Sequence, residues 1–171
     1  MTVENKLVEG IDLVCFNFFH ENEVDLYMLS TYGEVDLPLT VDGRLILFHS
    51  TSLTKLAFSL FPEELVKGQS IPVEVALTCN VPHAVKKIKS GKVDQKVTIL
   101  NCLNMFFDIF KVLNVDIPET YRKNLYAFAD YLTFEKNIVA FFDTTEAKRV
   151  DILQAFLWCV GTVLSNSKIL S

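Results

Sequence analysis

The first third of the chain has the apolar patterns of β-strands. Residues 13–19 form an apolar, aromatic run, which suits a strand buried on a pleated surface. Residues 24–28 alternate between apolar and more polar side chains, the period of a half-buried strand. Because the polar residues 20–23 separate the two runs, they predict an antiparallel hairpin with a short loop.

A second hairpin is marked by a specific turn signal. Asp42 and Gly43 separate the apolar residues 39–41 from residues 44–48, and Asp-Gly favours a type I′ turn, in which both central residues have positive φ. Pro38 has no backbone N–H, so the first of these strands begins there or lies at a sheet edge. A further alternating run predicts another strand over residues 72–78.

Helical spacing follows from residue 52 onward. Ser52 is expected to cap a first helix, and a short turn at residues 62–64 ends at Gly68. A helix over residues 82–88 is stopped by Gly91. The clearest helix covers residues 97–115, which are apolar apart from one narrow stripe of polar side chains at intervals of three, four and three: Asn101, Asn104, Asp108 and Lys111.

The C-terminal third continues this helical pattern. Pro118 begins another helix, residues 137–142 predict a short buried strand, and residues 143–146 resemble a capping box that starts the last helix. We expect residues 165–171 to fray. The buried face of the last helix is predicted to consist of Ala147, Val150, Leu153, Leu157, Val160 and Leu164.

These elements predict one α+β domain over residues 1–171. An antiparallel sheet built mainly from the N-terminal half packs on a helical layer from the C-terminal half. The alternative is a mixed sheet that receives residues 137–142 as a late strand. The core is expected to bury Phe106, Phe107, Phe110, Leu153 and Phe156.

Composition and charge limit the classes of function that the chain can have. Half of the 171 residues are hydrophobic and 14 are Phe, so disorder is excluded for most of the chain. The net charge is −5, and residues 1–60 alone carry three basic and nine acidic side chains. Because an acidic protein repels a phosphate backbone, nucleic-acid binding is not expected, whereas a basic partner is favoured.

The same survey sets expectations for compartment and cofactors. Residues 1–10 lack the features of a signal peptide, and four widely spaced cysteines fit a reduced, cytoplasmic protein. The longest uncharged stretch, residues 152–167, is too short for a spanning helix, so no membrane association is expected. No nucleotide loop and no paired metal-ligand spacing occurs, so we expect neither a cofactor nor a metal.

An acidic segment supplies the favoured functional hypothesis. Its acids occur without Lys or Arg and are interleaved with two tyrosines, a combination suited to charge steering and aromatic anchoring. We therefore predict a small non-catalytic protein-binding module, of the inhibitor, immunity or adaptor type, that binds a basic protein. The predicted partner-binding residues are Glu21, Glu23, Asp25, Tyr27, Tyr32, Glu34 and Asp36.

The alternative hypothesis is a cysteine-dependent enzyme. Cys79 is expected at the end of a strand and His83 in the first turn of the following helix. A helix N-terminus and an imidazolium both favour a thiolate, so the two residues would form a nucleophile and its base.

A cluster of five lysines follows the cysteine–histidine pair: Lys86, Lys87, Lys89, Lys92 and Lys96. The simplest interpretation is a solvated helix end. An RNA contact is a weaker alternative, because no aromatic side chain for base stacking lies among the lysines. A third interpretation pairs the cluster with the acidic N-terminal region of a second copy, giving a homodimer.

Overall fold

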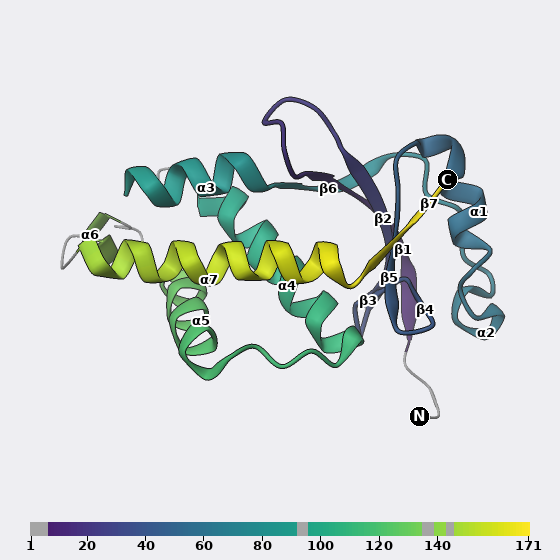
Figure 1. Cartoon of the computed structure of the whole chain (residues 1–171). Coiled ribbons are helices and arrows are strands. Elements are labelled where there is room, and N and C mark those ends of the chain that lie inside the picture. The colour runs from purple at the N-terminus through teal and green to yellow at the C-terminus, as the bar shows by residue number, and fades with distance from the viewer. Residues whose placement is uncertain (1–6, 92–95, 135–138, 143–145) are drawn as a thin grey trace.

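A mixed β-sheet stands between two layers of helices (Figure 1). The computed structural model describes residues 7–91, 96–134, 139–142 and 146–171. Within these ranges the fold is α+β, as the sequence predicts, and helices α3, α4, α5 and α7 cover one face of the sheet. Helices α1 and α2 cover the opposite face (Figure 1). The prediction of a single helical layer therefore missed the second, smaller one.

The sheet has seven strands in the described ranges, and its main path runs in the order β4-β5-β2-β1-β6. Off this path, β3 pairs with β2 and β7 pairs with β5. The strands are β1 (Val8–Asn17), β2 (Leu26–Gly33), β3 (Leu37–Pro38), β4 (Thr40–Val41), β5 (Arg44–Phe48), β6 (Val75–Asn80) and β7 (Ser167–Leu170).

Both predicted hairpins are confirmed. Strands β1 and β2 are antiparallel, with Phe16 opposite Leu26 at the loop end. Between β4 and β5, Asp42 and Gly43 have φ values of 52° and 73°, as a type I′ turn requires.

Two pairings make the sheet mixed rather than antiparallel throughout. Strand β6 runs parallel to β1, and β7 runs parallel to β5, from Leu45 opposite Ser167 to Phe48 opposite Leu170. The expectation of a frayed C-terminal tail is therefore wrong. Strand β5 is buried over Leu45–Phe48, and buried backbone N–H and C=O groups need partners, which β7 provides.

The helices on the smaller layer are α1 (Thr54–Phe58), which follows a 3₁₀ turn, η1 (Thr51–Leu53), and α2 (Glu63–Val66). The cap of this segment is Ser50 rather than the predicted Ser52, because the Ser50 hydroxyl accepts a hydrogen bond from the Ser52 amide at 3.3 Å.

The helices on the larger layer are α3 (Val81–Ser90), α4 (Lys96–Leu113), α5 (Glu119–Phe134), α6 (Val139–Phe142) and α7 (Glu146–Ser165). The strand predicted over residues 137–142 is wrong where the structure describes it, since residues 139–142 are helical. Residues 137 and 138, and residues 143–145 of the predicted capping box, lie outside the described ranges. No helix in those ranges is long and apolar enough to cross a membrane.

Two apolar clusters lie on opposite faces of the sheet. Val14 and Phe16 of β1 join the cluster under α3, α4, α5 and α7, whereas Ile11 and Leu13 join the cluster under α1 and α2. Among the predicted core residues, Phe106, Phe110 and Phe156 are buried, while Phe107 and Leu153 are only partly buried.

The predicted buried face of the last helix is wrong. Val150 and Leu157 are 48% and 47% exposed. Ala147 also belongs to the predicted buried face, but its side chain lies outside the described part of the structure. Helix α7 is apolar on two sides, so its periodicity alone does not fix which side turns inward. The side that does is Ile152, Ala155, Phe156, Cys159 and Val163.

Truncation of Phe156 tests the core. Its ring is fully buried and packs edge-on against Phe106 at 5.5 Å, so Phe156→Ala should lower the free energy of unfolding by about 3–5 kcal/mol. Phe134→Ala, at a ring that is 79% exposed, should change it by less than about 0.5 kcal/mol. Denaturant titration checks both variants, and equal effects would contradict this description of the core.

Candidate functional site

A half-open cleft lies between α4 and the sheet. Its volume is about 230 Å³, and strands β1, β2 and β6 contribute to its sheet side. Its helical wall contains Asn101, Asn104 and Asp108, which are three of the four polar residues that interrupt the apolar sequence of α4. We call it the acidic cleft and define it by its polar lining: Asp12, Tyr32, Asp36, Asn101, Asn104 and Asp108.

Strand register places the sheet residues of the acidic cleft. Asp12 lies opposite Ser30 and Gly10 opposite Tyr32, so Asp12 and Tyr32 project from the same face as Val14. A Cβ atom added at Gly10 would meet the Tyr32 ring and hydroxyl at 2.3–2.5 Å. Glycine at position 10 therefore lets the Tyr32 side chain lie across β1, at the mouth of the cleft.

The carboxylates of Asp12 and Asp108 are half-buried, and the exposed Asp36 repels both. Burial, and then the charge of Asp36, raise the pKa of Asp108 to about 6, although Lys111 acts in the opposite direction. The same two causes raise the pKa of Asp12. Each shift reports a negative charge that the fold disfavours.

No hydrogen bond or ion pair within the described ranges reaches the carboxylates of Asp12, Asp36 and Asp108. Among the same residues, no group of three or more His, Cys, Asp or Glu side chains converges on a metal ion.

The seven predicted partner-binding residues do not form one surface. Glu21, Glu23 and Asp25 lie in the β1–β2 loop, whereas Tyr32, Glu34 and Asp36 lie at or beyond the far end of β2. A strand of eight residues separates the two groups by roughly 25 Å. Tyr27 lies between them and is stacked on Phe48, with ring centroids 5.9 Å apart.

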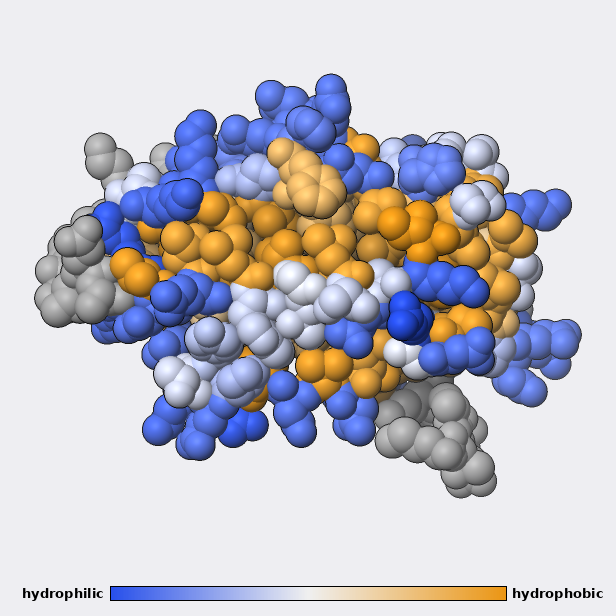
Figure 2. Space-filling model, in the orientation of Figure 1, coloured by the Kyte–Doolittle hydropathy of each residue, from blue (hydrophilic) through white to orange (hydrophobic). Residues whose placement is uncertain are grey.

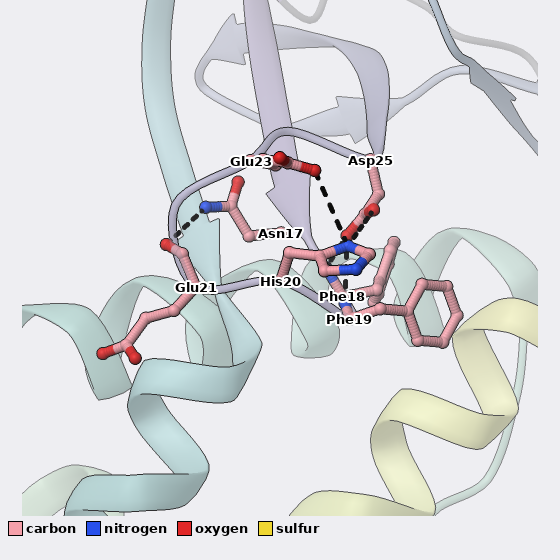
Figure 3. Close-up of polar contacts among 7 residues, drawn as sticks. All are labelled: Asn17, Phe18, Phe19, His20, Glu21, Glu23 and Asp25. Atoms are coloured by element: carbon pink, nitrogen blue, oxygen red, sulfur yellow. Dashed lines mark hydrogen bonds and ion pairs between the residues drawn. The ribbon is translucent and has the colours of Figure 1, made fainter.

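Asp25 holds the β1–β2 loop together (Figure 3). Its carboxylate accepts hydrogen bonds from the amides of Phe18 at 2.7 Å and Phe19 at 2.9 Å, and lies 3.4 Å from the His20 ring. Burial works to raise the pKa of Asp25, but these partners outweigh it and lower the pKa. Asp25 is therefore occupied within the chain.

Glu21 anchors the same loop to α3. Its carboxylate lies 2.8 Å from His83 and 3.9 Å from Lys86, and these contacts lower its pKa. Its carbonyl accepts hydrogen bonds from the side chains of Asn17 and Asn80. Glu23 lies 4.0 Å from the His20 ring (Figure 3), but its side chain is 77% exposed, so it is the most accessible acid of this loop.

The geometry of Cys79 disfavours the cysteine-enzyme hypothesis. Cys79 is fully buried, and its thiol donates to the carbonyl of Asn101 at 3.7 Å. The neighbouring Cys102 thiol and burial raise the pKa of Cys79 well above its usual value, whereas a nucleophile needs a lowered pKa. The ring of His83 is engaged by Glu21 instead.

The fold and the cleft define an α+β protein with an open acidic surface site. No protein-family model matches the chain, and no curated protein matches its sequence. The crystal structure of the SatS C-terminal domain in complex with bromine is similar in fold, with a TM-score of 0.58 over 94% of each chain and 14% sequence identity. At that identity the likeness establishes the fold alone.

Sequence reasoning missed four of the six polar residues that define the acidic cleft. Tyr32 and Asp36 were predicted as binding residues, but Asp12 and the three α4 residues were not. A signal existed, because Asn101, Asn104 and Asp108 interrupt an otherwise apolar helix. What the sequence did not reveal is which part of the sheet this stripe faces.

Replacing Asp108 by Asn tests the strained carboxylate. A folded-state pKa raised from 3.8 to about 6 means that the native state binds the proton more tightly than the unfolded state. The ionised carboxylate thus destabilises the fold at neutral pH. Asp108→Asn should raise the free energy of unfolding there by about 1 kcal/mol, a value reduced for solvent screening.

The gain should shrink as the pH falls through 6 and vanish below about pH 4, where Asp108 is protonated in both states. Denaturant titrations at several pH values measure it, with Asp130→Asn at an exposed position of α5 as the control. A gain that does not depend on pH would contradict the assignment.

Thiol labelling tests the burial of the cysteines. All four are free and buried, so a disulfide reagent should react slowly with the native protein and with four thiols per chain after denaturation. One rapidly reacting thiol, lost in Cys79→Ser, would instead revive the cysteine-enzyme hypothesis.

Proposed function

We propose that this chain is a non-catalytic protein-binding module whose acidic cleft receives a basic side chain of a partner protein. The observation that carries the proposal is the group of three carboxylates, Asp12, Asp36 and Asp108, that line the cleft and make no hydrogen bond or ion pair with another described residue. A bound cation would relieve the repulsion that raises the pKa values of Asp12 and Asp108.

The chemistry of the lining favours a guanidinium or ammonium group. The amide oxygens of Asn101 and Asn104 add uncharged acceptors beside the carboxylates. Tyr32, 39% exposed at the mouth, offers an aromatic face to a cation. An arginine side chain presents five N–H donors in a planar fork, so it can use several of these acceptors at once.

Acids outside the cleft contribute to the approach of the partner. Glu34 beside the cleft and Glu23 in the β1–β2 loop are both exposed, and surface charges of one sign accelerate association with an oppositely charged protein. Glu23→Lys should therefore slow association with a basic partner and make the association rate less sensitive to salt, whereas a cleft variant should mainly accelerate dissociation.

A small-molecule titration tests the site without knowledge of the partner. N-acetyl-arginine amide, added to isotopically labelled protein, should shift the side-chain amide resonances of Asn101 and Asn104 with millimolar affinity. N-acetyl-citrulline amide, which matches its shape without the charge, should not. Affinity should fall as the pH drops through about 6 with protonation of Asp108, and Asp12→Asn/Asp108→Asn should abolish the shifts.

Capture from a lysate of the source organism then tests the macromolecular partner. The wild-type protein should retain a basic protein that elutes at moderate salt. The Asp12→Asn/Asp108→Asn variant should lose it, while the Asp130→Asn variant retains it. A partner that both variants retain equally, or equal binding of the arginine and citrulline probes, would overturn the proposal.

A further inference from the structure

Helix α7 carries an apolar stripe on its outer side. Its positions follow one another at intervals of three, four, three and four residues, and the most exposed are Val150 and Leu157, at 48% and 47%. Figure 2 shows an apolar band along the face of the molecule that α7 and α3 form in Figure 1. We call this the α7 stripe: Val150, Leu153, Leu157, Val160 and Leu164.

An exposed aromatic ring lies above the same face. Phe19 is 70% exposed, although its backbone is held firmly by the hydrogen bond from its amide to Asp25. In Figure 3 its ring projects from the β1–β2 loop on the side of the α7 ribbon. The loop thus presents an apolar ring on the side of α7 where Val150 and Leu157 are exposed. The other three residues of the α7 stripe are partly buried, with one side packed against the core.

Gly161 is a second anomaly on this side of α7. It lies in the interior of the helix, it is exposed, and an added Cβ atom would meet nothing within 4 Å. Glycine is a poor helix former compared with alanine, and no contact within the described chain requires it. A missing side chain between Leu157 and Leu164 lets another backbone approach the helix closely.

We propose that α7 pairs with α7 of a second copy of this chain, antiparallel and across a two-fold axis near Leu157. Alternating intervals of three and four are the pattern with which two helices interlock their side chains. A stripe of this kind is complementary to itself, as a two-fold interface requires. Near the axis, Gly161 of each copy allows the two helices to come close.

The charges beside the stripe favour a second copy as the occupant. Lys89 lies at the N-terminal end of α7, where Arg149 donates a hydrogen bond to its carbonyl at 3.2 Å. The acidic β1–β2 loop is level with the C-terminal half of α7 (Figure 1). In an antiparallel pair, the two-fold axis lies in the interface and runs perpendicular to α7. It therefore places the exposed Glu23 of one copy on the same side of the dimer as the exposed Lys89 of the other copy.

Sedimentation over a range of concentrations tests the pairing. The wild-type chain should show a reversible dimer at micromolar concentration, and Leu157→Glu should weaken the dimer at least a hundredfold. Leu56→Glu is the matched control, because Leu56 is 48% exposed but lies on α1, on the opposite layer. Circular dichroism confirms that each variant remains folded.

Two further variants separate this interface from any other apolar contact. Gly161→Ala should weaken the dimer about tenfold while it raises the thermal midpoint of the monomer, since the fold tolerates the methyl group and the interface does not. Lys89→Glu should weaken association, and Lys89→Glu with Glu23→Lys should restore it.

The outcomes that overturn the proposal are distinct from those for the acidic cleft. A wild-type chain that stays monomeric at high micromolar concentration, or a dimer that survives Leu157→Glu, rules out pairing through α7. Neither result changes the expected response of the cleft to the arginine probe, because the stripe and the cleft share no residue.

Discussion

Burial of the central strands on both faces is the constraint on which the rest of the structure depends. Strands β1 and β5 carry apolar side chains on each side of the sheet, so neither face can be left to solvent. One face receives α3, α4, α5 and α7, and the short helices α1 and α2 cover the other. The open backbone edge of β5 is then satisfied by β7, which ties the C-terminus to the N-terminal half of the chain.

The acidic cleft arises where polar side chains occur among the buried apolar side chains of the sheet and of α4. Asp12 stands between the buried apolar residues Ile11 and Leu13 of β1, and Asp108 stands on α4, which buries seven apolar side chains in the core. Strand register and the path of α4 bring these interruptions together, with the ring of Tyr32 at the mouth because Gly10 leaves room for it. Burial of the two carboxylates, and then the repulsion of Asp36, raise the pKa values of Asp12 and Asp108.

Local signals in the sequence predicted the local structure well. The Asp42-Gly43 turn, the stop at Gly91 and the long helix α4 depend on residues close in sequence, and each is confirmed. The errors concern long-range choices: β7 needs β5 as a partner, and either apolar side of α7 suits a core. The lining of the cleft shows the same division, since Tyr32 and Asp36 belong to the acidic segment visible in the sequence, whereas Asp12 and Asp108 come together only in the fold.

Two groups of side chains are unusual for the degree of burial that the fold gives them. The carboxylates of Asp12 and Asp108 are half-buried in the cleft without a hydrogen bond or ion pair in the described ranges, and Val150, Leu157 and Gly161 are exposed along α7. Natural sequences are otherwise consistent with their structures, so such disagreements are expected at functional or strained sites, and the two proposals rest on them. The two places differ in chemistry and share no residue, so both can be occupied at once. A dimer joined through α7 would carry two acidic clefts, and a partner with two suitably spaced basic segments would gain affinity from both, because the second contact forms within the complex.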